Sequence, residues 1–130
     1  MTQLNLGDNL LTPPDQISIL KRLVIAYKLL HTYLPNFPRT IRFTLGEKLD
    51  LLLLKIMAIV FTASKLCKEE KLPLVQKAST YIDHAKFFLQ IAWEMNLLDD
   101  KKYARISEHI ADIGKMTGGW IRQLKANSAH

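Results

Sequence analysis

The strongest constraint on the fold is a set of four long segments with helical periodicity. Apolar residues recur at intervals of three and four over residues 14–34, 40–70, 73–96 and 99–125. Prolines at 35, 38 and 73 and polar residues around 96–100 separate these segments. Because short connections between long amphipathic helices favour antiparallel neighbours, the sequence predicts an all-α fold, an up-down-up-down antiparallel four-helix bundle.

Residue types at the expected helix ends indicate where the helices begin. Thr12, which precedes two prolines, is typical of an N-cap, and either Asp99 or Asp100 is expected to cap the last helix. The second helix begins at Thr40, or at Thr44 if Thr44 forms a capping box with the glutamate three residues later. Both starts are open at this point.

The length of the chain limits the number of domains. It has 130 residues, which is typical of one domain. We therefore expect a single domain over residues 1–130, with flexible tails at 1–12 and 126–130. The break between the second and third helices is expected at 71–73, where a proline follows a lysine and a leucine.

Three of the predicted helices each have one apolar stripe that should face the core. The stripe of the first helix consists of Ile17, Leu20, Val24, Tyr27, His31 and Leu34. That of the third consists of Val75, Ala78, Ile82, Ala85, Leu89 and Ala92. That of the fourth consists of Tyr103, Ile106, Ile110, Ile113, Trp120, Ile121 and Leu124. Glycines at 114 and 118 in the last helix favour close approach of a neighbouring helix, and the alternative is a local break at 118–119.

The second helix has two apolar faces. One face, expected in the core, consists of Leu45, Leu49, Leu52, Leu53, Ile56, Val60 and Ala63. The second face includes Leu51, Leu54, Met57 and Phe61, and we predict that these four side chains form the interface of a homo-oligomer. Thick packing against both neighbouring helices, or a monomer with one apolar side, would account for the same pattern.

The sequence shows no catalytic or metal-binding pattern. The chain has four histidines and one cysteine, and their spacings match no zinc or di-iron motif. Cys67 is expected in the core of the second helix as an unreactive thiol. We therefore predict no catalytic residues, no cofactor, no small-molecule substrate and no enzymatic activity. No signal peptide is evident, and Lys55 interrupts the most apolar stretch, so no membrane span is expected and a cytoplasmic location is predicted.

The charge balance is the main functional indication. The chain has 18 Lys and Arg against 12 Asp and Glu, a net charge of +6 and a pI near 9.5. Such a balance is typical of nucleic-acid binding, although a soluble protein without such a role can have it too. The residues predicted to contact phosphates are Lys21, Arg22, Lys28, Arg39, Arg42, Lys48, Lys55, Lys115 and Arg122. Arg39 and Arg42 are alternatively structural, tying the first connection to carboxylates such as Glu47. Few aromatic residues interleave with the basic ones, so stacking of single strands is not indicated.

Two stretches resemble the accessory variability determinant family. The first is Leu-Pro-Asn-Phe-Pro-Arg at 34–39, followed by Arg-Phe-Thr-Leu-Gly at 42–46. The second runs from Ile-Ser-Glu at 106–108 through Ile-Gly-Lys-Met at 113–116 to Gly-Gly-Trp-Ile at 118–121. Thr117 follows Met116 where the family pattern has leucine. The resemblance covers residues 14–124.

The resemblance implies a four-helix protomer that assembles into a positively charged homopentameric barrel. It also implies a role in diversity-generating retroelements, where the accessory protein binds the reverse transcriptase and its template RNA or cDNA. Such a protein supports mutagenic retrohoming and has no catalytic activity. The related family encoded in ribosomal RNA intervening sequences shares the bundle. The main alternative is thus a structural or protein-interaction module without a retroelement role, and a metal- or ligand-binding bundle enzyme is a second one.

Overall fold

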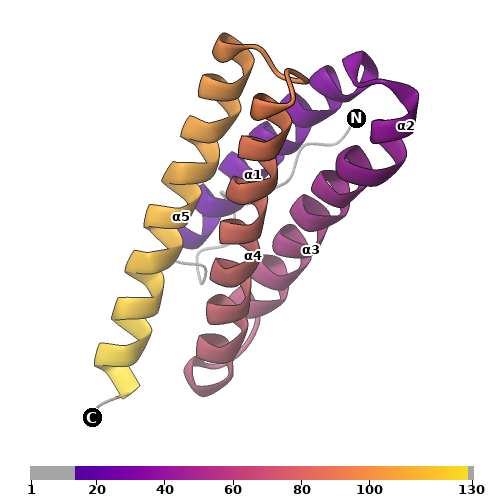
Figure 1. Ribbon diagram of the computed structural model, residues 1–130. Coiled ribbons are helices and arrows are strands. Elements are labelled where there is room, and N and C mark those ends of the chain that lie inside the picture. The colour runs from indigo at the N-terminus through magenta and orange to yellow at the C-terminus, as the bar shows by residue number, and fades with distance from the viewer. Residues whose placement is uncertain (1–13, 129–130) are drawn as a thin grey trace.

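The computed structural model describes residues 14–128, and these residues form helices and short connections with no strand (Figure 1). Four helices are long: α1 (Pro14–Tyr33), α3 (Glu47–Ser64), α4 (Lys68–Glu94) and α5 (Asp100–Ser128). The predicted all-α class with four helices is confirmed. The expected cap Thr12 and the tail 1–12 lie outside the described residues, as does the side chain of Ile17.

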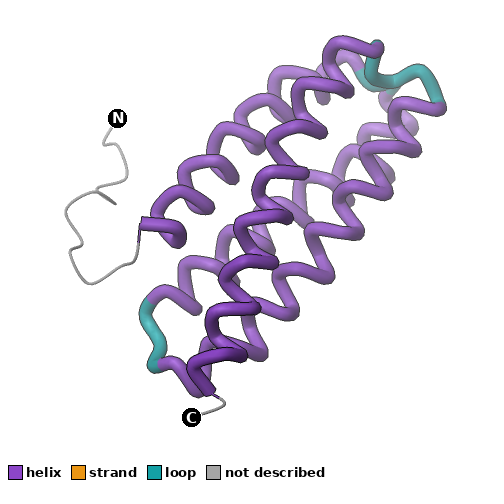
Figure 2. Tube along the Cα trace, turned by 90° about the vertical axis from the view of Figure 1, so that its left-hand side faces the viewer, coloured by secondary structure: helices purple, strands orange, loops and turns teal. Residues whose placement is uncertain are grey.

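The four long helices form one bundle. Both α1 and α4 pack against α3 and α5. Figure 2 shows the two main loops at opposite ends of the bundle, one joining α3 to α4 and the other joining α4 to α5. This arrangement fits the predicted order of helices. At the α4–α5 end, the Asp99 side chain accepts a hydrogen bond of 2.8 Å from the backbone N–H of Lys102 and so caps α5.

Short helical turns make up the connection between α1 and α3. A 3-10 turn, η2 (Leu34–Asn36), is followed by α2 (Arg39–Ile41) and a π-helical turn, η3 (Arg42–Gly46), that leads directly into α3. The helical region therefore begins near the earlier of the two predicted starts. The capping box is not formed, because the Thr44 hydroxyl donates to the carbonyls of Thr40 at 3.4 Å and Ile41 at 3.2 Å.

The predicted break between the second and third helices at 71–73 is wrong. The structure places α3 up to Ser64 and begins α4 at Lys68, so that Pro73 lies inside α4. The backbone N–H groups of Glu70 and Lys71 bond to the carbonyl of Cys67 and close the first turn of α4 before the proline is reached. Pro73 lies in the second turn, where it removes only the one hydrogen bond that its own N–H would donate to the carbonyl four residues earlier, so the rest of α4 keeps its bonds.

The core confirms most of the predicted stripes. All six stripe residues of α4 are buried. The core face predicted for the second helix is buried too, except for Leu45, which is half-buried in η3. In α5 the stripe is confirmed, with Tyr103 and Ile121 half-buried. The stripe of α1 is displaced, because its buried residues include Ile19, Leu20, Leu23, Ala26, Leu30 and Tyr33. His31 is exposed, so its placement in the core is wrong.

The α5 helix runs without interruption through all three glycines, so the local break is not present. A Cβ atom on Gly114 would lie 3.0 Å from Nζ of Lys86 and 3.7 Å from Cγ2 of Ile82, both on α4. Close packing is therefore confirmed at Gly114. At Gly118 a Cβ atom would meet the side chain of Arg122 on the same helix, and among residues 14–128 no other helix comes within 4 Å of it.

Candidate subunit and nucleic-acid interfaces

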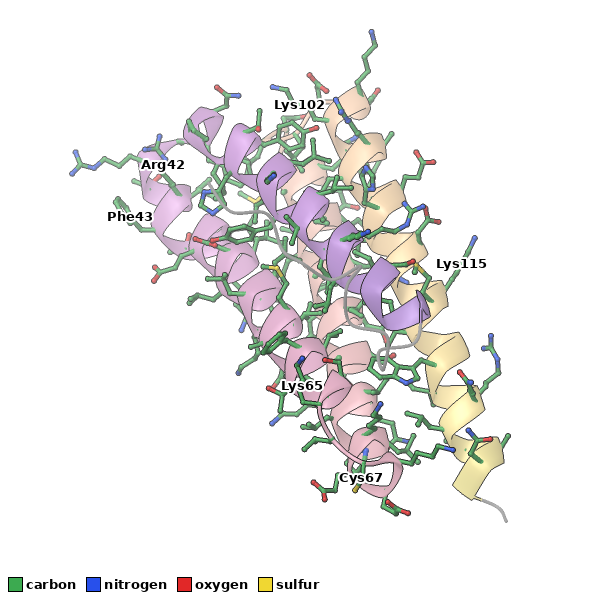
Figure 3. All side chains as sticks on the ribbon, turned by 180° about the vertical axis from the view of Figure 1, so that it is seen from behind. Arg42, Phe43, Lys65, Cys67, Lys102 and Lys115 are labelled. Atoms are coloured by element: carbon green, nitrogen blue, oxygen red, sulfur yellow. The ribbon has the colours of Figure 1, made fainter. Side chains whose placement is uncertain are left out.

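Large apolar side chains are exposed on the side of α3 that no other helix covers. We call this surface the outer face of α3 and define it by Leu51, Leu54 and Phe61. These side chains are 55%, 43% and 53% exposed, respectively. Met57 is only partly exposed and packs against the core. Phe43 in η3 is 63% exposed and lies at the edge of the molecule in Figure 3. The structure thus leaves three of the four predicted interface residues available to a partner.

An open cavity of about 430 Å³ lies where α1, η2 and η3 meet. Arg42 lines it, and its guanidinium donates hydrogen bonds to the carbonyls of Pro35 and Phe37, both at 3.1 Å. Arg42 therefore has a structural contact with the connection. Its partners are backbone carbonyls, whereas the sequence suggested a carboxylate such as Glu47.

A polar cluster on one wall of this cavity joins α1 to α3. Nε2 of His31 lies 3.2 Å from Oδ1 of Asp50, and the ring centroids of Tyr27 and His31 are 4.5 Å apart. Burial raises the pKa of Tyr27 to about 12, and hydrogen bonding to Asp50 and the negative charge of Asp50 act in the same direction. The cluster explains why α1 turns His31 toward α3 and away from the core.

Two predicted phosphate contacts lie along the seam between α3 and α4. Nζ of Lys48 is 5.9 Å from the centroid of the Phe88 ring, and Nζ of Lys55 is 4.8 Å from that of Tyr81. His84 meets Tyr81 edge-on, with ring centroids 5.9 Å apart. Aromatic residues therefore interleave with lysines here. The sequence pattern does not reveal this arrangement, because the two kinds of residue belong to different helices.

The other predicted phosphate contacts are spread over the bundle. Arg22 on α1 pairs with Asp112 on α5 at 3.2 Å. The remaining predicted contacts, all exposed, are Lys21 and Lys28 on α1, Arg39 at the start of α2, and Lys115 and Arg122 on α5. Figure 3 places Arg42 and Lys115 at opposite edges of the molecule. The nine residues thus do not form one patch on a single protomer.

A comparison with protein families identifies the chain. A sequence model described as bAvd-like, for bacterial accessory variability determinants, matches residues 17–124. The chain belongs to the bAvd-like family. The match extends from α1 into the last turns of α5, and it confirms the resemblance found in the sequence. A comparison with curated proteins finds no match.

The single cysteine of this bAvd-like chain lies outside the core. Cys67 is exposed in the α3–α4 loop, so the prediction of a core position in the second helix is wrong (Figure 3). Its thiol donates a hydrogen bond to Oε1 of Glu70 at 3.2 Å. This bond, followed by one involving Glu69, raises the pKa of Cys67, so the nucleophilic thiolate is disfavoured.

Two further predictions concern metal sites and membrane-spanning helices. Within residues 14–128, no group of three or more His, Cys, Asp or Glu side chains is placed to hold a metal ion. None of the helices described is long and apolar enough to cross a membrane.

Proposed function

We propose that this bAvd-like protein is the non-catalytic accessory protein of a diversity-generating retroelement. In this role it binds the element's reverse transcriptase and its template RNA or cDNA, and it supports mutagenic retrohoming. Membership of the bAvd-like family over residues 17–124 is the observation that carries the proposal. The protein works in the cytoplasm, needs no cofactor and contributes binding surfaces to a reaction that the reverse transcriptase catalyses.

The proposed assembly is a homopentamer of up-down-up-down bundles that associate through the outer face of α3. Support comes from Leu51, Leu54 and Phe61, three large apolar side chains that are exposed on one side of α3. Five copies in a closed ring multiply the net charge of +6 per chain. On a single protomer the basic residues do not form one patch. A ring brings basic residues of neighbouring copies close to one another.

Nucleic acid is proposed to bind through phosphate contacts with little sequence readout. The residues proposed to make them are Lys21, Lys28, Arg39, Lys48, Lys55, Lys115 and Arg122, all of them exposed. Arg22 and Arg42 remain candidates, but each also holds two parts of the protomer together.

Co-expression with the reverse transcriptase of a diversity-generating retroelement from the same genome tests the proposal. We expect the two proteins to copurify, and light scattering of the accessory protein alone to give the mass of a pentamer. RNA should bind with an affinity that falls steeply with salt, and exchange of Lys48 and Lys55 for glutamate should weaken binding at least about tenfold. A pentamer that binds neither RNA nor reverse transcriptase would instead indicate a structural or protein-interaction module.

A further inference from the structure

The seam between α3 and α4 combines lysines and aromatic rings in one stripe. We call it the seam stripe and define it by Lys48 and Lys55 of α3 and Tyr81, His84 and Phe88 of α4. Each lysine is paired with one ring, and the pairs are seven residues apart on both helices. Seven residues of helix correspond to about 10.5 Å, so the stripe presents two similar cation–ring units at a fixed spacing.

The negative charges of both helices lie away from the seam stripe. Glu69 and Glu70 are in the first turn of α4, more than ten residues before Tyr81. On α3, Glu47 and Asp50 line the cavity next to α1. On α4, Asp83 lines a groove between α4 and α5, and Glu94 accepts a hydrogen bond from Gln90, which lines the same groove. The stripe is therefore locally more basic than the chain as a whole, which suits a polyanion.

A hollow at one end of the seam stripe extends the ring surface. It has a volume of about 360 Å³, and its lining includes Leu45, Lys48, Phe88 and Met95. Met95 is exposed, and Phe88 is only half-buried. An apolar hollow beside an aromatic ring and an ammonium group matches the mixed chemistry of a nucleotide, whose base is flat and whose phosphate is charged.

We propose that the seam stripe binds single-stranded nucleic acid, RNA or DNA, by stacking bases on Phe88 and Tyr81. This inference rests on the proposed nucleic-acid role. It adds that the bound nucleic acid is single-stranded and that the seam stripe is its binding site. A base takes the place of the ammonium group over each ring, and Lys48 and Lys55 move to the phosphates on either side. Bases in a duplex are already stacked on each other and cannot reach the rings, so the stripe discriminates against duplexes.

The test compares variants that lose the rings but keep the apolar packing. Tyr81→Leu and Phe88→Leu are combined. The matched control is Phe87→Leu, an exposed ring on the same helix whose centroid lies 5.6 Å from that of Phe88 but which lines the groove toward α5. Fluorescence anisotropy measures binding of a labelled oligo(U) of about 15 nucleotides, a length within the usual range of single-strand sites. A mixed-sequence RNA duplex is measured in parallel.

We expect the double variant to lose at least about tenfold in affinity for oligo(U) while its affinity for the duplex stays within about twofold. Phe87→Leu and the conservative Tyr81→Phe should bind oligo(U) as the wild type does. Equal losses for oligo(U) and duplex, or a loss as large in Phe87→Leu, would overturn the inference.

A measurement on the unaltered protein guards against a folding defect in the variants. Oligo(U) containing 4-thiouridine is crosslinked by light to the wild type, and we expect the crosslinked peptide to contain Tyr81 or Phe88. Crosslinks confined to α1 or α5 would refute the site. If the wild type binds neither oligo(U) nor duplex, the proposed function itself fails. If it binds both and the double variant keeps its affinity for oligo(U), only the seam stripe is refuted.

Discussion

Replacement of Arg42 by lysine separates the two roles that the sequence leaves open for this residue. Its guanidinium donates to two carbonyls, those of Pro35 and Phe37, both at 3.1 Å. Both bonds come from one nitrogen, Nη2. The side chain of lysine is one bond shorter than that of arginine, so its ammonium keeps the charge but falls short of the position of Nη2. The substitution therefore removes the link across the α1–α3 connection and leaves the net charge unchanged.

The size of the effect follows from where these two hydrogen bonds lie. Bonds from charged donors contribute about 1.5–3 kcal/mol each when they are protected from water. Arg42 is exposed, and only its bond to Phe37 is partly buried, so we expect a total loss of about 1–2 kcal/mol. For a domain of this size the loss corresponds to a fall in Tm of about 3–8 °C.

Thermal unfolding followed by circular dichroism tests this expectation at one fixed protein concentration, because self-association makes Tm depend on concentration. Arg39→Lys is the matched control, since Arg39 is exposed near the same connection and its substitution should leave Tm within about 1 °C. RNA binding should be the same for both variants. If Arg42→Lys melts like the wild type but loses RNA affinity, the structural role is refuted and Arg42 is a binding residue.

Three further predictions concern other parts of the protomer. The pKa of Tyr27 is about 12 in the folded protein, against about 10 in the unfolded chain. This difference stabilises the fold fully below about pH 10, and the stabilisation is lost as the pH rises toward 12. Asp50→Asn should therefore lower the pKa of Tyr27 in an NMR titration, and an unchanged value would refute the coupling. Gly118→Ala should stabilise the protomer by about 0.5–1 kcal/mol in urea unfolding, because only one flexible side chain is near; a loss would indicate a hidden contact. Combined Leu51→Ser and Leu54→Ser should give monomers by light scattering with helical content retained, whereas an unchanged mass would exclude the outer face of α3 as the interface.

The sequence predicts burial well where one helix face meets the core without polar competition. All six stripe residues of α4 are buried, including Ala78 and Ala85, which a search for large apolar residues alone would overlook. Periodicity identifies them because a helix in a bundle buries every third or fourth residue whatever its size. The cap at Asp99 is equally local, since its bond spans only three residues.

The wrong predictions have physical causes that no local sequence pattern reveals. Pro73 lies inside α4 because the first turn of that helix closes at Cys67, and the position of that turn depends on where α3 ends. His31 has the spacing of a core residue, but its partner Asp50 is on another helix and draws it to the surface. The sequence contains both residues without indicating their contact, so periodicity alone misplaces the stripe of α1.

The seam stripe shows why counting basic residues ranks binding sites poorly. Lys48 and Lys55 pair with rings that lie more than 20 residues further along the chain, and only the packing of α3 on α4 joins them. A phosphate contact at the seam is accompanied by stacking of the neighbouring base on a ring. A phosphate contact at a lysine such as Lys21 depends on charge. Equal charges therefore contribute unequally, and the two seam lysines should outweigh an exposed pair on α1 in affinity for single strands while giving the same salt dependence.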